Sequence, residues 1–392
     1  MVNLDKKTHV GVVGAGTMGS GIAHVAAAYG HAVSVFDTDA GARKRAGNVL
    51  EKVLDRLVSK GRIDAAAAGA IKERVVFVDK LDALAPCGLV IEAIIEDLAA
   101  KNDLFTKLES TVDEPSVLAT NTSSLSIASI ASACKHPERV LGIHFFNPAP
   151  LMPLVEIIPG IDTSEKISGS TRSLIDAWGK TTVVAKDTPG FIVNRVARPF
   201  YGESLRILEE GIADVVTIDW AMKQFGGFRM GPFELMDFIG NDVNYTVTES
   251  VFNSFFHDPR YKPSFTQKRL VEAGRLGRKT ERGFYDYAAG TPAPKADEDE
   301  ARGREIFMRV LVMLINEAAD ALFWQVATRE DIDLAMTKGV NYPKGLLAWA
   351  DEIGLDEVLR RMESLQHEYG EDRYRPSPLL RRLSGAGETF HT

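Results

Sequence analysis

The stretch HVGVVGAGTMG, residues 9–19, decides how the first part of this 392-residue chain folds. Val10 to Val13 form a short apolar run that is typical of a buried strand. Gly14, Gly16 and Gly19 follow in a G-x-G-x-x-G pattern, where glycines permit a tight turn and a close approach of the backbone to a pyrophosphate. The N-terminus of the next helix would face the negative charge of that group. The stretch therefore predicts a strand, a phosphate-binding turn and a helix.

A carboxylate follows the glycines at the spacing of a dinucleotide site. The second apolar run ends at Phe36 and Asp37, about 20 residues after the glycine pattern. A carboxylate at this position accepts hydrogen bonds from the adenosine ribose hydroxyls and repels a 2′-phosphate, so Asp37 favours NAD over NADP. The alternative, a glycine turn that binds no ligand, fits this context less well.

Apolar runs alternate with amphipathic stretches over roughly the first 185 residues, as in a largely parallel sheet covered by helices. We expect strands at Val10–Val13, Ala32–Phe36, Val75–Val78, Leu89–Ile94, Val117–Ala119, Val140–Ile143, Leu154–Ile158 and Thr182–Ala185. We expect helices at Met18–Tyr29, Leu98–Ser110 and Ser164–Trp178, and two more between Ala40 and Glu73 that meet in a turn at Lys60-Gly61-Arg62.

After Pro189 the strand patterns stop, and helical patterns begin with residues 191–210. This helical part repeats itself, because a shift of 114 positions aligns Arg195-Val196 with Arg309-Val310 and Ile239-Gly240 with Ile353-Gly354. We expect the second copy to end before any counterpart of Gly283-Phe284-Tyr285.

The predicted organisation is an α/β Rossmann-type NAD-binding domain followed by two tandem all-α C-terminal domains. The boundaries are residues 1–187 for the NAD-binding domain, 188–287 for the first helical copy, 288–302 for a linker rich in small, charged and proline residues, and 303–392 for the second copy.

Composition restricts the partners and the compartment. The net charge of −8, from 46 basic and 54 acidic residues, provides no general field that attracts nucleic acid or an anionic membrane. Cys87 and Cys134 lack the spacing of a disulfide framework or a metal site. The first residues do not resemble a signal peptide, and no apolar run is long enough to span a membrane. We expect a cytoplasmic protein without nucleic-acid, membrane or metal partners.

The segment LGIHFFNPAPLMPLVE, residues 141–156, contains the best candidate for a chemical centre. His144 ends one apolar run and Glu156 lies in the next, so two adjacent strands would bring the side chains together. Histidine exchanges protons near neutral pH, and a carboxylate on its second ring nitrogen fixes its tautomer. The alternative is a buried histidine paired with a structural glutamate, and the pair alone does not decide between the two.

Two further polar segments adjoin predicted strand ends. Asn121-Thr122-Ser123-Ser124 follows a strand at the edge where open α/β sheets bind ligands. We expect Ser124 to cap the next helix, whereas Ser123 is a candidate for contact with a substrate oxygen. Asn194 falls in the first helical turns after the domain junction, where a role in a cleft competes with an ordinary exposed position.

Seven motifs occur in the order GVVGAGTMGSGIA, VIEAIIEDLAAK, NTSSLSI, GIHFFNPAPLMPLVE, DTPGFIVNR, MGPFELMDFIG and GRKTERGFYDY. Over residues 8–287 the chain resembles the L-3-hydroxyacyl-CoA dehydrogenase family, and residues 303–390 are similar to a second C-terminal domain of that family. The resemblance implies NAD-dependent oxidation of an acyl-CoA substrate.

The resemblance also implies residue roles. His144 would be the general acid/base and Glu156 its orienting carboxylate, with Ser123 and Asn194 around the substrate 3-oxygen. The implied cofactor contacts are Gly14, Gly16, Gly19, Asp37, Glu96, Lys101, Asn147 and Lys279. Lys60 would hold the CoA moiety, although Val53 stands where the family can use a serine. The helical domain would supply the wall of the acyl pocket around Phe233, Met236 and Phe238.

Two other functions fit the same residues. One is an NAD-dependent dehydrogenase of a free hydroxy acid or alcohol, which Val53 leaves open, and the other is a non-catalytic NAD-binding protein.

In the second helical copy Met308 replaces Asn194, so we expect that copy to be architectural. The chain would then be a monomeric pseudo-dimer, with a homodimer as the alternative.

Overall fold

The computed structural model describes residues 4–391, which form two compact units with the boundary in the chain between Thr188 and Pro189. The first unit contains one eight-stranded sheet in the order β3-β2-β1-β4-β5-β6-β7-β8. Its strands are β1 (Val10–Val13), β2 (Val33–Phe36), β3 (Val75–Val78), β4 (Leu89–Glu92), β5 (Val117–Thr120), β6 (Val140–Phe145), β7 (Leu154–Pro159) and β8 (Thr181–Val184). All the expected strands are present, and their ends differ from the predicted ones by at most two residues.

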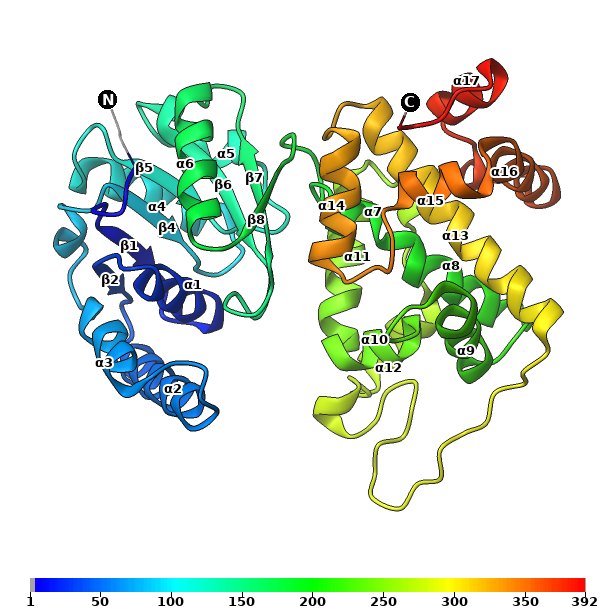
Figure 1. The fold of residues 1–392 in the computed structure, drawn as a ribbon, viewed down its shortest axis with the longest axis horizontal. Helices are drawn as coiled ribbons and strands as arrows, with labels where there is room; N and C mark the ends of the chain where they lie inside the picture. The colour runs from blue at the N-terminus through cyan, green and yellow to red at the C-terminus, as the bar shows by residue number, and fades with distance from the viewer. Residues whose placement is uncertain (1–3, 392) are drawn as a thin grey trace. The chain divides into compact units, whose positions relative to one another are not determined.

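The sheet is parallel except at one pair. β7 runs antiparallel to β6, and β8 runs parallel to β7. The helices of this unit are α1 (Thr17–Ala28), α2 (Ala40–Ser59), α3 (Ala65–Arg74), α4 (Leu98–Thr111), α5 (Ile127–Ala131) and α6 (Glu165–Ala177). They agree with the predicted helices, and α2 and α3 form the expected pair, which projects from the sheet (Figure 1). Gly61 in the turn between them has a φ of +64°, which favours glycine.

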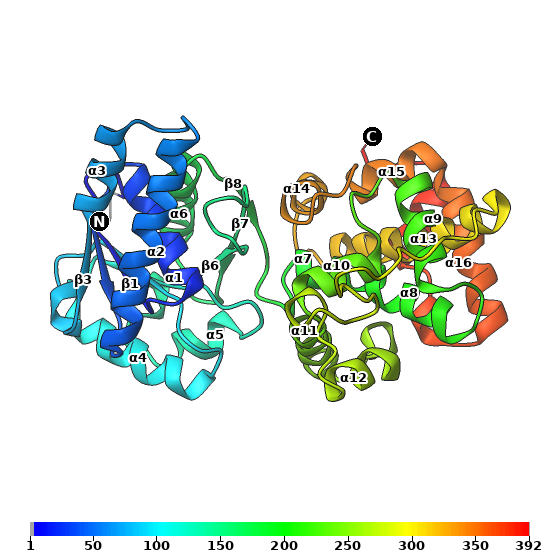
Figure 2. The same ribbon diagram turned by 90° about the horizontal axis from the view of Figure 1, so that it is seen from below.

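Helices cover both faces of the sheet and form two apolar cores (Figure 2). Residues of α1 and α6, such as Ile22 and Ile175, pack with Val12 and Ile143 on one face. Residues of α4, such as Phe105, pack on the other face. The helices therefore exclude water from the central strands and leave the strand ends as the exposed edge for a site.

The second unit is entirely helical. Its first copy contains α7 (Val193–Val196), α8 (Arg198–Glu209), α9 (Val215–Gly226), α10 (Pro232–Ile239), α11 (Asn241–Ser254) and α12 (Phe265–Glu272). Its second copy contains α13 (Glu300–Phe323), α14 (Arg329–Gly339), α15 (Leu346–Ile353), α16 (Leu355–Tyr369) and α17 (Pro378–Ala386). The starts of α9, α10 and α11 precede those of α14, α15 and α16 by the 114 residues of the sequence repeat.

Three details differ from expectation. The helix expected from Phe191 begins at Val193 because Phe191 has a φ of +48°, and it breaks before α8, where Pro199 lacks an N–H to donate. α13 begins at Glu300, inside the expected linker, because the Asp299 side chain caps it by accepting from the Arg302 amide.

The third difference concerns the end of the second copy, which does contain a counterpart of Gly283-Phe284-Tyr285. In the first copy Asp237 accepts hydrogen bonds from the amides of Phe284 and Tyr285, at 3.0 and 2.9 Å. In the second copy Asp351 accepts from the amides of Phe390 and His391, at 2.7 and 3.2 Å. The expectation that the counterpart is missing was wrong. Residues 389–391, Thr-Phe-His, take the place of Gly283-Phe284-Tyr285, and the two sequences share only the phenylalanine.

The two copies exchange reciprocal buried ion pairs. Arg195 of the first copy donates through Nε to Glu317 of the second, and Arg309 of the second donates to Glu203 of the first, both at 2.6 Å. These pairs coincide under the 114-residue shift, so equivalent surfaces of both copies meet, as across a two-fold axis. Tyr261 and Tyr374 donate to the same carboxylates. The copies therefore pack as a pseudo-symmetric pair within one unit.

Asp219 fixes the start of α10 in the first copy. Its carboxylate accepts from the Phe233 and Glu234 amides at 2.9 Å and from the Tyr285 hydroxyl at 2.7 Å. Burial raises the pKa of Asp219 from 3.8 to about 7, although these donors oppose the shift.

This raised pKa predicts a pH-dependent stability difference. Native Asp219 binds its proton more tightly than the unfolded chain does, so its contribution to stability is complete below pH ~4 and is lost as the pH rises through about 7. The free energy of unfolding of wild type minus that of Asp219→Asn should therefore decrease between pH 4.5 and 7.5. Urea unfolding followed by tryptophan fluorescence measures it, with exposed Asp103→Asn as the control; a constant difference would contradict the prediction.

Candidate active site

His144 and Glu156 are direct partners across the antiparallel pair β6–β7. The His144 Nδ1 lies 2.7 Å from Glu156 Oε2, and the side chains are buried at 5% and 0% exposure. An N–H on Nδ1 that donates to the carboxylate leaves Nε2 as the basic nitrogen. The pairing of adjacent strands that the sequence predicted is confirmed, with His144 inside β6 and not at its end.

Asn121, the first residue after β5, holds the end of β6. Its Oδ1 accepts from the Phe145 amide at 2.8 Å, next to His144. The sequence singled out the Asn-Thr-Ser-Ser segment but gave Asn121 no role. Its position directly after a strand, where its side chain can extend hydrogen bonding to the neighbouring strand, was the available signal.

Glu96 organises the segment that carries Ser123. Its Oε1 accepts from the Thr122 hydroxyl at 2.6 Å and from the Ser123 and Ser124 amides at 2.9 and 3.1 Å. Burial alone would raise the pKa of Glu96, but Lys101 and these donors outweigh it and lower the pKa. Glu96 is therefore a carboxylate that fixes Ser123. The prediction that Ser124 caps α5 was wrong. Ser126 is the cap, because the Ser124 hydroxyl donates to Glu96.

Lys101 lies behind Glu96 in a buried charge cluster. It is 1% exposed, and its Nζ lies 2.6 Å from Glu92 Oε1 and 3.3 Å from Glu96 Oε2. Glu92 also accepts from the Thr120 hydroxyl at 2.7 Å. Each charge of such a pair offsets part of the cost of burying the other. Lys101 thus holds Glu96 in position.

The glycine turn has the form that a bound pyrophosphate needs. Gly14 has a φ of +102°, and a Cβ there would lie 2.6 Å from the Ala93 carbonyl oxygen. Gly16 precedes α1, which has no side-chain cap, and a Cβ there would meet nothing within 4 Å. The space over Gly16 and the uncapped helix start fit a phosphate group. Asp37 accepts from the Ala15 amide at 2.7 Å and so lies against the same turn.

The remaining predicted residues lie in three places. Asn147 is exposed in the loop between β6 and β7 and precedes a cis Pro148. Lys60 is exposed at the C-cap of α2, and Val53 is exposed within the same helix. In the second unit, Asn194 is half-buried in α7, and the Nζ of Lys279 lies 2.6 Å from Asp242.

Of the three side chains expected to line an acyl pocket, one is accessible. Phe233 and Met236 are completely buried in the first helical copy, and Phe238 is 59% exposed. The helical pattern showed that these residues are apolar but not which of them the neighbouring helices cover.

Lys180 was missed by the sequence analysis. Its Nζ donates to the carbonyl oxygens of Ala149 and Met152 at 2.6 and 2.8 Å, and so ties down the loop that carries Asn147. Burial lowers the pKa of Lys180 to about 8. A lone lysine before a strand carries no pattern that would have revealed this contact.

Comparison with known proteins identifies the family. The model of the 3-hydroxyacyl-CoA dehydrogenase NAD-binding domain matches residues 9–188, and the model of the C-terminal domain of that family matches residues 190–287 and again 306–390. The chain belongs to the 3-hydroxyacyl-CoA dehydrogenase family. The predicted fold class and the NAD cofactor are thereby confirmed.

Several relatives match most of the chain. A 3-hydroxyadipyl-CoA dehydrogenase of Escherichia coli is 39% identical over 95% of this chain and 96% of its own length. A 3-hydroxybutyryl-CoA dehydrogenase of Bradyrhizobium diazoefficiens is 42% identical over 73% of this chain and 97% of its own length. The solved structure of a 3-hydroxybutyryl-CoA dehydrogenase of E. coli superposes with a TM-score of 0.92 at 38% identity, covering 98% of this chain and 99% of that one.

No helix among residues 4–391 is both long and apolar enough to cross a membrane.

The contacts of Lys180 predict a positioning role in cofactor binding. Lys180→Met should raise KM for NAD several-fold and change kcat less, because the loop with Asn147 loses two hydrogen bonds while the His144–Glu156 pair remains. Steady-state kinetics with varied NAD measure this split. Lys107→Met, which removes an exposed lysine of α4, is the control. A several-fold loss in the kcat of Lys180→Met without a change in its KM for NAD would contradict the positioning role.

Proposed function

We propose that this dehydrogenase oxidises L-3-hydroxyacyl-CoA to 3-oxoacyl-CoA reversibly, with His144 as its general base. The observation that supports this most is the buried His144–Glu156 pair in the same unit as the glycine turn and Asp37. A binding protein would need the turn but not a histidine whose tautomer a carboxylate controls. The pair therefore favours an enzyme over a non-catalytic NAD-binding protein.

His144 takes the proton of the 3-hydroxyl through Nε2, and Glu156 stabilises the imidazolium that forms. The acceptor for the hydride that leaves C3 would be supplied by the nicotinamide of bound NAD. Ser123 and Asn194 donate hydrogen bonds to the 3-oxygen as its charge changes. In the reverse direction the His144 imidazolium returns the proton to the alkoxide.

Cofactor and CoA contacts follow the same proposal. Gly14, Gly16 and Gly19 would hold the pyrophosphate and Asp37 the adenosine ribose. Glu96, Asn147 and Lys279 would be further cofactor contacts, with Lys101 acting through Glu96. Lys60 supplies an ammonium group to a CoA phosphate.

A test of the base is the variant His144→Gln. It should lower kcat by roughly 10²–10⁴-fold, because the amide cannot accept the hydroxyl proton, and it should bind NADH as wild type does. Loss of NADH absorbance with acetoacetyl-CoA measures turnover, and NADH fluorescence measures binding. A variant with turnover near that of wild type would exclude His144 as the base. Oxidation of free hydroxy acids but not of acyl-CoA would favour the alternative dehydrogenase.

We also propose that the chain is a monomeric pseudo-dimer. The reciprocal pairs Arg195–Glu317 and Arg309–Glu203 support this, because they already fill within one chain the contact that two equivalent domains would make. The Bradyrhizobium relative aligns over 97% of its length with only 73% of this chain, so the second copy is additional to it. A homodimer is the alternative oligomeric state. The cytoplasmic location of the protein stays a prediction from its sequence.

Light scattering tests the oligomeric state. We expect the mass of one 42.9 kDa chain at micromolar concentration. Twice this mass, with contacts through residues 188–287 of both chains, would contradict the pseudo-dimer.

A further inference from the structure

Arg198 is a buried cation without a carboxylate partner. It is the first residue of α8 and is 7% exposed. Its Nη1 donates to the Thr248 hydroxyl at 3.1 Å, its guanidinium lies 5.0 Å from the centre of the Tyr201 ring, and its buried Nε makes no hydrogen bond. Among residues 4–391, no carboxylate oxygen lies within ion-pair distance of it. Burial lowers the pKa of Arg198, but an arginine remains charged in proteins.

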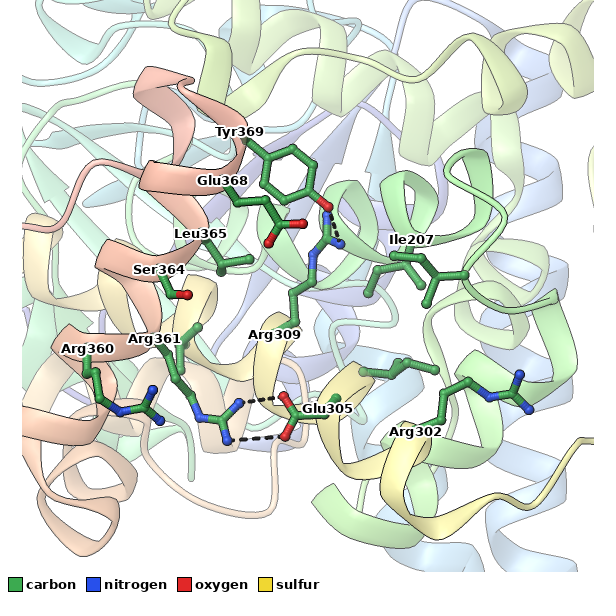
Figure 3. Close-up of a pocket in the computed structure, with 13 residues that line it drawn as sticks. Ile207, Arg302, Glu305, Arg309, Arg360, Arg361, Ser364, Leu365, Glu368 and Tyr369 are labelled. Carbon is green, nitrogen blue, oxygen red and sulfur yellow. Dashed lines mark hydrogen bonds and ion pairs between the residues drawn. The ribbon is translucent and has the colours of Figure 1, made fainter.

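Other arginines of the same unit are neutralised. Arg195 and Arg309 pair with Glu317 and Glu203 between the copies. A cavity of about 500 Å³ between α8, α13 and α16 is also lined by arginines, but Figure 3 shows Arg361 facing the Glu305 carboxylate, at 2.8 Å. A buried charge without a compensating partner is strongly destabilising. Arg198 is therefore an exception that the packing of this unit does not explain.

The internal repeat supplies a control for the role of Arg198 in folding. The 114-residue shift places Val312 at the equivalent position of the second copy, where it is completely buried. The same helical framework thus accepts an apolar side chain here. The same shift aligns Asn194 with Met308. The polar side chains of Asn194 and Arg198 therefore occur only in the first helical copy, which contains the proposed contact of Asn194 with the substrate 3-oxygen.

Arg198 lies one helical turn beyond Asn194. Although α7 ends at Val196, Ala197 keeps right-handed helical angles. The Cβ atoms of Asn194 and Arg198 are therefore about 5–6 Å apart, as for residues four positions apart on a helix. In a six-carbon dicarboxylic acyl chain, the three bonds from C3 to the terminal carboxylate span about 4 Å. An acyl chain with its 3-oxygen at Asn194 would therefore bring such a carboxylate within reach of Arg198.

We propose that Arg198 binds the terminal carboxylate of a dicarboxylic 3-hydroxyacyl-CoA and so sets the substrate class; this rests on the proposed function above. The planar guanidinium suits a carboxylate, and its Nε is available as a donor. Tyr342 of the second copy has a buried hydroxyl without a hydrogen bond. Burial raises the pKa of Tyr342, and the positive charge of nearby Arg198 opposes this shift. Through Tyr342 the second copy contributes to this subsite.

The decisive comparison uses two substrates of equal length. Carbon 6 of the acyl chain is a carboxylate in 3-hydroxyadipyl-CoA and a methyl group in 3-hydroxyhexanoyl-CoA. We expect wild type to prefer the first by about 10²-fold or more in kcat/KM, because the apolar analogue leaves Arg198 unpaired. In Arg198→Met the preference should disappear or reverse, and Arg198→Lys should give an intermediate ratio, because lysine keeps the charge but loses the planar donor geometry.

The ratio of the kcat/KM values for the two substrates distinguishes loss of this subsite from a general loss of folded enzyme. Misfolding lowers both kcat/KM values and leaves their ratio unchanged. Arg361→Met, which changes an arginine paired with Glu305, is the control and should leave the ratio unchanged. No preference in wild type, or an unchanged ratio in Arg198→Met, would overturn the subsite alone. If the Met variant does not fold, the Lys variant decides: an unchanged ratio overturns the proposal. An enzyme that oxidises neither substrate overturns the proposed function itself.

Discussion

The first unit depends on one exception to its parallel sheet, the antiparallel pairing of β6 with β7. This pairing places His144 opposite Glu156, and because side chains alternate along a strand, a shift of one residue would turn the carboxylate to the other face. The register is strongly specified, since both strands are buried along nearly their whole length. Asn121 adds a hydrogen bond at the end of β6, and Lys180 holds the connecting loop. The geometry of the proposed acid/base pair thus follows from backbone pairing that the apolar core enforces.

The sequence predicted what depends on local pattern. Strand positions, the projecting helices α2 and α3, the glycine turn and the proximity of His144 to Glu156 all follow from apolar periodicity and short motifs, and the structure agrees with them. It did not predict contacts that join segments distant in the chain. Nothing near Lys180 or Arg198 in the sequence indicates that one would bind carbonyl groups and the other would lack a carboxylate. The end of the second copy was misjudged because His391 replaces Tyr285 while the backbone contacts to an aspartate remain.

The repeated helical copies make it possible to compare two sequences in one fold. Positions that keep their contacts in both copies, such as Arg195 with Arg309 and Asp237 with Asp351, serve the framework. Positions that differ in polarity, such as Asn194 with Met308 and Arg198 with Val312, are not required by it. This distinction separates structural from functional side chains without reference to another protein.

The covalent connection between the two copies has a consequence for behaviour at low concentration. Two separate chains that need each other dissociate when they are diluted below their dissociation constant. Residues 288–299 join the copies, and a short tether of this kind gives an effective concentration in the millimolar range, whatever the number of molecules in solution. The helical framework beneath the proposed substrate contacts therefore stays assembled even when a cell makes very few copies of the enzyme.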